Sequence, residues 1–296
     1  MAEPAKTKKP MLIGFILLAV FVAAYISVLF LYQSEGETRK AELSYDAEKL
    51  EKLDKNRIAA EAKIVTADPM KGDIAVRLVF TPQGNLAGPD GKLARDLVLD
   101  VAAATGKHVY EFKKGRKMDP VETIVDIYEG EPMDFPFDEH EGQLAFFFTP
   151  AGDRAEQIPV ALEMRGSVSG LRIDAEYGEG NSDTNAVVDI SICRARTTMF
   201  FSLFIMLAMW ALAIGVVCLV FRVFAGQRKI EISMFSFLGA LLFAFPALRN
   251  SQPGTPPIGT LSDFLAFFWA EVIIALSLLS VVLRWIIRGP GGEAQK

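Results

Sequence analysis

Four long apolar stretches occupy the two ends of the chain. Residues 11–32 contain no acidic or basic side chain, and residues 197–221 and 232–248 are equally free of charge. The fourth stretch, residues 264–283, is interrupted only by Glu271. Because about 20 helical residues, each rising about 1.5 Å, cross a hydrocarbon core of roughly 30 Å, the pattern predicts four transmembrane helices.

Two features refine these helices. The first stretch is longer than the apolar core of a cleaved signal peptide, which is about 7 to 15 residues, so we interpret it as an uncleaved anchor. The third stretch contains Pro246 close to its end, where a proline predicts a kink or an early stop.

The middle of the chain has a two-residue period instead. Apolar and polar residues alternate in short runs separated by turn signals such as Pro89-Asp90-Gly91, which is typical of an antiparallel β-sandwich. We expect this extracytoplasmic domain to cover residues 59–196, inserted between the first and second transmembrane helices. Residues 33–58 are highly charged and predict a linker or a short helix. The strands are expected at residues 73–81, 97–101, 121–128, 144–149, 158–164, 171–177 and 186–193.

The charge distribution supports a topology. Residues 35–196 hold 21 Lys and Arg against 31 Asp and Glu, a net charge of −10, whereas the rest of the chain carries +5. Basic residues cluster in the N-terminal tail (1–10), between the second and third helices, and in the C-terminal tail (284–296). Short basic flanks stay cytoplasmic. We therefore expect a multi-pass plasma (inner) membrane protein with both termini cytoplasmic and residues 33–196 outside.

The two cysteines limit the covalent chemistry. Cys193 ends the last expected strand and Cys218 lies inside the second apolar stretch, so the two thiols are expected at different depths and unpaired. A domain without disulfides depends on its own core, as in a bacterial envelope protein. Only Ala195 separates Arg194 from Arg196, and both arginines are expected at the headgroup level as anchors or as ligands of anionic lipid.

Motifs of known chemistry are absent from the sequence. There is no phosphate-binding loop, dinucleotide fingerprint, nucleophile elbow or zinc-protease helix, so we expect no enzyme activity, catalytic residue or cofactor. The acidic balance of the middle domain argues against nucleic-acid binding. Residues 134–141 gather acids around His140 without a second His or Cys, so we interpret them as a turn with two buried rings, Phe135 and Phe137, rather than a metal site.

The candidate functional residues lie near the end of the chain. Glu271 is expected about 10 Å inside the fourth helix, where a carboxylate is costly and a functional candidate by default. Its expected partner is Arg249, at the end of the third helix, and Asp263 precedes the fourth. The intervening loop is stiffened by three prolines and is either a binding surface or a rigid connector. These prolines are Pro253, Pro256 and Pro257.

A family resemblance rests on two of these segments. The turn Phe135-Pro136-Phe137-Asp138 and the stretch from Leu248 to Gly259, followed by Asp263 and by Phe267-Phe268-Trp269-Ala270-Glu271, resemble an uncharacterised family of multi-pass bacterial and fungal membrane proteins catalogued as a domain of unknown function. The resemblance implies the same architecture of one N-terminal span, a β-rich ectodomain and three C-terminal spans. It implies no activity.

Two functions fit these observations. The first is a binding, scaffold or assembly component of the cell envelope, with membrane lipids and an envelope protein as partners. The alternative is a small transporter or channel subunit that uses Glu271. In the first case Glu271 is a structural partner of nearby polar groups, and in the second it binds an ion or a proton.

Overall fold

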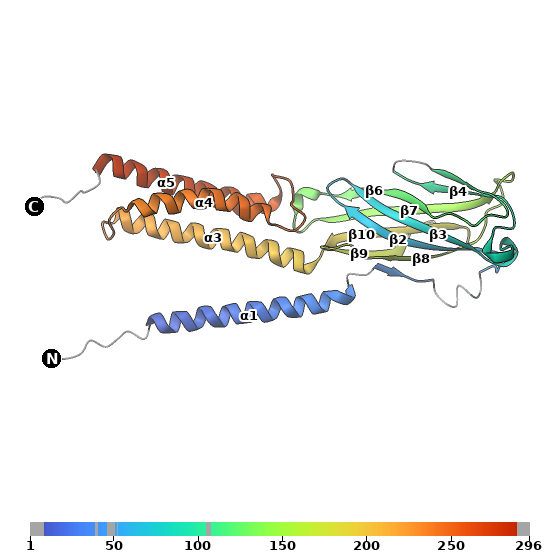
Figure 1. The fold of residues 1–296 in the computed structure, drawn as a ribbon, viewed down its shortest axis with the longest axis horizontal. Helices are drawn as coiled ribbons and strands as arrows, with labels where there is room; N and C mark the ends of the chain where they lie inside the picture. Colours follow the sequence, from blue (N-terminus) through green and yellow to red (C-terminus); the bar gives the residue numbers. More distant parts are fainter. Residues whose placement is uncertain (1–8, 39–40, 46–50, 52, 105–107, 289–296) are drawn as a thin grey trace, which may run out of the picture.

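The computed structural model describes all residues except 1–8, 39–40, 46–50, 52, 105–107 and 289–296. The molecule is elongated, with the strands gathered at one end and the helices at the other (Figure 1). The strands are β1 (Ala41–Leu43), β2 (Ile58–Asp68), β3 (Asp73–Pro82), β4 (Leu97–Ala102), β5 (Val109–Phe112), β6 (Val121–Gly130), β7 (Glu139–Pro150), β8 (Val160–Gly166), β9 (Leu171–Tyr177) and β10 (Asn185–Arg194).

The strands form one continuous barrel-like sheet in the order β1-β8-β2-β3-β6-β7-β10-β9, with β4 paired to β7 and β5 to β4. Strand β6 pairs with β3 through residues 121–126 and with β7 through residues 127–130, with an irregularity between Ile127 and Glu129. The two halves of the domain therefore share β6, instead of forming the two separate sheets expected of a sandwich. The expected antiparallel pairing also has one exception, because β2 and β8 are parallel.

The alternating pattern places one face of each strand in a common core. Along β3, Ile74, Val76 and Leu78 are buried while the intervening Arg77 is exposed. Four phenylalanines meet edge to face or at a tilt within this core, namely Phe80, Phe112, Phe146 and Phe148. Burial of these rings fixes the register, since a shift by one residue would turn each apolar set outward.

Three strands were not expected from the sequence. Strand β1 has three residues and β5 has four, both near the lower limit of strand length. Strand β2 contains four alanines together with Glu61 and Lys63, and these residue types are depleted in strands. It extends nonetheless, because Ala60, Ala62 and Ile64 are buried while β2 pairs with β3 on one side and β8 on the other.

Four helices make up the other end of the molecule: α1 (Lys9–Thr38), α3 (Arg196–Phe224), α4 (Ile232–Asn250) and α5 (Phe268–Arg288). A π-helical turn, η4 (Asp263–Phe267), leads directly into α5. In the part of the chain that the structure describes, three helices are long and apolar enough to cross a membrane, namely residues 196–224, 232–250 and 263–287. Helix α1 lies apart from the other three along most of its length in Figure 1.

The helix boundaries differ from the expected ones. Helix α1 continues six residues past the expected end at residue 32, into the charged segment 33–58. Helix α4 continues four residues beyond Pro246, so the proline does not stop it. Most of the expected N-terminal tail and residues 289–296 of the C-terminal tail lie outside the described residues, as do residues 46–50 and 52 of the expected linker.

Candidate functional site

Arg249 and Asp263 form a buried ion pair where α4 ends and η4 begins. The Nε and Nη2 atoms of Arg249 donate to Asp263 Oδ1 at 2.7 Å and to Oδ2 at 2.8 Å. Both side chains are buried. Arg249 lies at the end of α4 and Asp263 is the first residue of η4. The loop between them, residues 251–262, turns the chain back so that the two side chains meet, and we call it the Pro-rich loop.

The remaining donors of Arg249 hold the Pro-rich loop. Nη1 donates to Pro256 O at 2.6 Å and to Asn250 Oδ1 at 3.4 Å, and Nη2 donates to Pro257 O at 2.5 Å. Gly259 N also donates to Asp263 Oδ2 at 2.7 Å. Every N–H of the guanidinium has an acceptor. The Arg249–Asp263 pair is therefore a structural latch with no donor left for a ligand.

The three prolines of the loop have different surroundings. Pro256 is buried and Pro257 is exposed, and both offer their carbonyl oxygens to Arg249. Pro253 is half-buried and makes no contact with the guanidinium. These contacts support the interpretation of the loop as a rigid connector. Arg249 donates to the carbonyl oxygens of Pro256 and Pro257, which would otherwise form hydrogen bonds with water.

Glu271 does not pair with Arg249, in contrast to the sequence-based expectation. All donors of Arg249 are already used by Asp263 and by the Pro-rich loop. Glu271 lies in the first turn of α5, eight residues after Asp263. Its Oε2 atom is buried and has no hydrogen-bond partner among the described residues. A buried carboxylate oxygen without a donor is unusual and costly.

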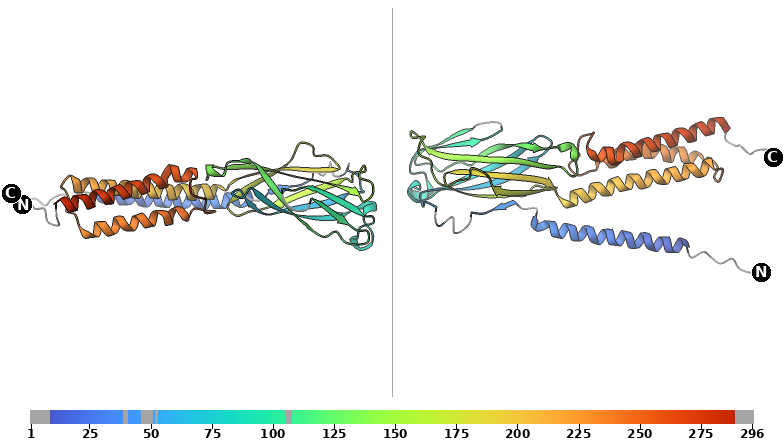
Figure 2. Two further views of the ribbon diagram at one scale, coloured as in Figure 1. Left: turned by 90° about the horizontal axis from the view of Figure 1, so that it is seen from above. Right: turned by 180° about the vertical axis from the view of Figure 1, so that it is seen from behind.

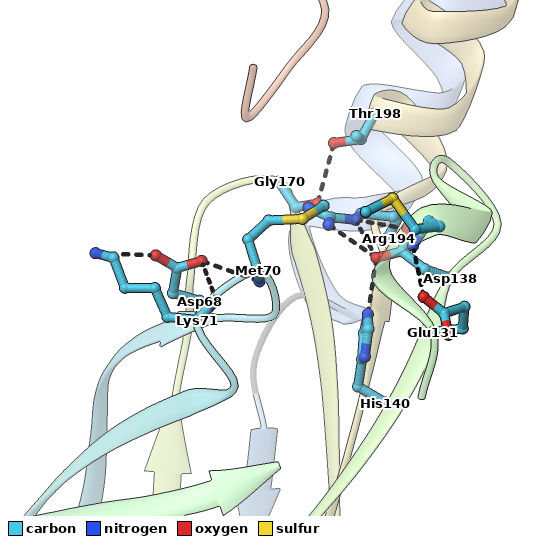
Figure 3. Close-up of polar contacts among 10 residues, drawn as sticks. Asp68, Met70, Lys71, Glu131, Asp138, His140, Gly170, Arg194 and Thr198 are labelled. Atoms are coloured by element: carbon cyan, nitrogen blue, oxygen red, sulfur yellow. Dashed lines mark hydrogen bonds and ion pairs between the residues drawn. The ribbon is translucent and has the colours of Figure 1, made fainter. Parts of the chain in front are cut away.

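A second buried cluster lies within the β-domain where β10 ends, two residues before α3 begins, and local sequence patterns did not predict its pairing (Figure 3). Arg194, the last residue of β10, donates through Nε to both oxygens of Asp138 at 2.9 Å and through Nη2 to Oδ2 at 2.8 Å. Its guanidinium lies 5.0 Å from the centre of the Phe135 ring. Arg194 is buried, so it is not the lipid-facing anchor expected from the sequence.

His140 completes this cluster. Its Nε2 atom lies 2.8 Å from Asp138 Oδ2, and because an ionised carboxylate only accepts, Nε2 carries the proton and donates it. Burial would by itself raise the pKa of Asp138, but the hydrogen bonds from Arg194 and His140 and the charge of Arg194 outweigh burial and lower that pKa below its ordinary value. Asp138 is thus held as an anion between two donors.

Two hydrogen bonds cross between the β-domain and the helices, and a third links two helices beside them. Ser262 N, at the end of the Pro-rich loop, donates to Phe135 O at 3.2 Å. Thr198 Oγ1 on α3 donates to Gly170 O at 3.0 Å (Figure 3). Thr197 N donates to Glu35 Oε1 at 2.7 Å, which ties the end of α1 to the start of α3. We call this whole set of contacts, with the Arg194–Asp138–His140 cluster, the junction.

The turn between β6 and β7 only partly matches its interpretation. Phe135 is fully buried as expected, whereas Phe137 is 47% exposed, so the turn buries one ring rather than two. The Phe135–Pro136 peptide bond is cis. Asp138 and His140 of this segment belong to the junction, whereas Asp134, Glu139 and Glu141 are exposed. Across the described residues there is no group of three or more His, Cys, Asp or Glu side chains able to hold a metal ion.

The chemistry available at these sites is that of binding and support. The latch and the Arg194–Asp138 pair are buried and satisfied by protein partners. Burial also raises the pKa of the Cys193 thiol, which makes it a poor nucleophile. The two cysteines are free, as expected. The molecule therefore combines a β-rich domain with a bundle of apolar helices, joined through a buried polar junction.

Two family models match this architecture part by part. Residues 49–192 match a domain of unknown function (DUF4436), and residues 194–288 match a second domain of unknown function (DUF8686). Both matches are to domains of unknown function, in agreement with the resemblance of the turn and the Pro-rich loop to an uncharacterised family. The two matches meet at Cys193, one residue before the end of β10. No curated protein matches the chain.

Proposed function

We propose that the protein is an integral plasma-membrane protein that acts as a binding, scaffold or assembly component of the cell envelope. In this arrangement α1, α3, α4 and α5 cross the membrane, one before and three after the β-domain, and the β-domain lies outside. Membrane lipids and an envelope protein are its partners. The basic flanks and the apolar composition of the helices support this placement.

The observation that carries the proposal is the rigid joint between the two halves. One residue, Ala195, lies between β10 and α3, and hydrogen bonds from Ser262 N and Thr198 Oγ1 cross to the β-domain; the buried Arg194–Asp138 pair fixes the end of β10 beside them. Breaking such a pair leaves an uncompensated buried charge, which costs about 3–5 kcal/mol. A domain held this firmly keeps a fixed height and orientation over the membrane, which suits a component that positions a partner.

The proposal can be tested by crosslinking in native membranes. The full chain is crosslinked through its β-domain, purified in mild detergent and compared with Asp138→Asn, which weakens the junction, and with Glu163→Gln, which alters only an exposed ion pair. We expect a discrete partner with the parent chain and Glu163→Gln, and a much lower yield with Asp138→Asn. Repeated recovery of the chain alone would contradict the proposal.

A second candidate function rests on Glu271. Its Oε2 atom is buried and accepts no hydrogen bond from the described residues, and a carboxylate within an apolar helix is a candidate ion or proton site. The neighbouring π-helical turn η4 adds weight, because π-helical turns recur at functional sites. In this alternative the protein is a small transporter or channel subunit.

Flux measurements separate this candidate from the first. The parent protein and Glu271→Gln are reconstituted into vesicles, and proton- or cation-dependent flux is recorded. The transporter function predicts flux that Glu271→Gln abolishes, while the crosslinked partner is retained. Absence of flux in the parent protein, or equal flux in the variant, would exclude it.

A further inference from the structure

The turn between β6 and β7 carries two exposed apolar side chains on either side of a buried one. Met133 is 45% exposed and Phe137 is 47% exposed, whereas Phe135 between them is fully buried. Phe135 anchors the turn, so the exposure of its neighbours is a fixed property of the fold. Large apolar side chains that a fold holds in contact with solvent mark an interaction surface when they gather at one place.

The turn between β6 and β7 lies at the level at which the helices begin. Phe135 O accepts the hydrogen bond from Ser262 N, and the turn lies beside the Pro-rich loop in Figures 1 and 2, where both are seen at the inner end of the β-domain. The adjacent loop residue Ile258 is 72% exposed, and Phe264 of η4 is 58% exposed. The turn therefore lies at the level where the helix bundle begins, and both the turn and the loop beside it carry exposed apolar side chains.

We propose that this turn inserts into the lipid interface, with Met133 and Phe137 at the boundary between headgroups and acyl chains. The inference rests on the membrane placement proposed above, which puts this end of the β-domain next to the bilayer surface. Amphipathic and aromatic side chains are enriched at this depth of a bilayer. The turn would then set the height and tilt of the β-domain, with the bilayer as a third support beside the junction.

The charge of the turn specifies the kind of lipid. Glu131 and Asp134 are exposed on the same turn, on either side of Met133. Two carboxylates at the headgroup level are repelled by an anionic surface and tolerated by a zwitterionic one. The partner is therefore a neutral phospholipid interface, and contact weakens as the fraction of anionic lipid rises.

Spin-label accessibility tests the proposal on the full chain. Nitroxides are placed at single cysteines in a Cys193→Ser/Cys218→Ser background, in phosphatidylcholine vesicles, and collisions with oxygen and with a water-soluble nickel complex are compared. The test position is Phe137→Cys, supported by Met133→Cys. The hydrocarbon reference is Phe243→Cys on α4, where the native side chain is 83% exposed, and the aqueous reference is Val79→Cys on β3.

The expected result is an oxygen-to-nickel ratio at Phe137 several-fold above that at Val79 and approaching that at Phe243. It should fall when half of the lipid is replaced by phosphatidylglycerol. A ratio equal to that at Val79, with Phe243 still in hydrocarbon, would overturn the inference and leave the proposed membrane placement intact. Phe137 shielded from both reagents would overturn it in favour of a protein partner. Phe243 open to nickel would overturn both proposals.

Discussion

At the scale of single residues, Arg249 has the most demanding environment in the helix bundle. It joins the end of α4, the Pro-rich loop and the start of η4 through hydrogen bonds to four different residues. A lysine could replace the charge but not the planar fork of donors. The hydrogen bonds from Arg249 therefore determine the conformation of the Pro-rich loop as much as its prolines do.

Replacing this side chain should loosen the bundle. Arg249→Ala leaves Asp263 buried without its partner, and we expect a loss of about 3–5 kcal/mol in the free energy of unfolding. Thermal unfolding in detergent measures the effect. The matched control is Arg222→Ala at the exposed end of α3, which should cost less than about 0.5 kcal/mol. Equal effects of the two substitutions would show that the latch does not stabilise the bundle.

The second residue-scale prediction concerns Asp138 and pH. Its pKa is lower in the fold than in the unfolded chain, so its contribution to stability is complete above the unfolded value of about 4 and is lost as the pH falls through the lower folded value. The stability difference between the parent and Asp138→Asn should thus be constant near neutral pH and shrink below about pH 4. Chemical unfolding over this range checks it. A difference that does not change with pH would mean that Asp138 is not the ionised partner of Arg194.

Sequence reasoning identified the residues of the candidate site better than their pairings. Arg249, Asp263 and Glu271 were chosen because charges are rare in apolar stretches, and this signal is local. Which carboxylate meets Arg249 depends on how the Pro-rich loop returns, and the loop directs Asp263 to it instead of Glu271. The Asp138–Arg194 pair spans 56 positions, so only the closed sheet reveals it.

At the scale of elements, the alternation of apolar and polar residues predicted the strands that have one buried and one exposed face. It missed strands such as β2, whose extended conformation depends on pairing with neighbouring strands. Strand β9 falls on the expected residues. The observed β3, β6 and β10 are each one or two residues longer than expected. Strand β2 was missed because its Ala and Lys residues signal a helix, and pairing on both edges overrides that preference. The local pattern also could not predict that β6 is shared between β3 and β7, because β6 changes its pairing partner within one continuous run of alternating residues.

The end of β6 provides an element-scale prediction. Gly130 has a φ of +122°, and a Cβ atom there would collide with Glu139 O and the His140 ring. Gly130→Ala should therefore disturb the start of β7 and expose the junction to protease. Gly152 has nearly the same φ, +121°, with nothing within 4 Å, so Gly152→Ala has the same backbone strain without the collision. Limited proteolysis should cleave Gly130→Ala faster, and equal rates would exclude a role for close packing.

At the scale of the whole molecule, the β-domain and the bundle of α3, α4 and α5 are joined where β10 leads into α3. The β-domain has a net negative charge and a core of its own, and the helices α3, α4 and α5 have a separate apolar core. Hydrogen bonds from Ser262 N to Phe135 O and from Thr198 Oγ1 to Gly170 O link the helices to the β-domain. This arrangement specifies one orientation of the β-domain on the helices, since the hydrogen bonds are directional.

The orientation of this molecule across the membrane yields the last prediction. Single cysteines are introduced at Asp90, in the β-domain, and at Gln227, between α3 and α4, in a chain whose two native cysteines are replaced by serine. With the proposed topology, a membrane-impermeant maleimide applied to intact cells should label Asp90→Cys in the β-domain. It should label Gln227→Cys only after permeabilisation, because the basic residues Arg222, Arg228 and Lys229 favour a cytoplasmic loop. The reverse pattern would invert the topology, and labelling of both positions in intact cells would mean that α3 does not cross the membrane.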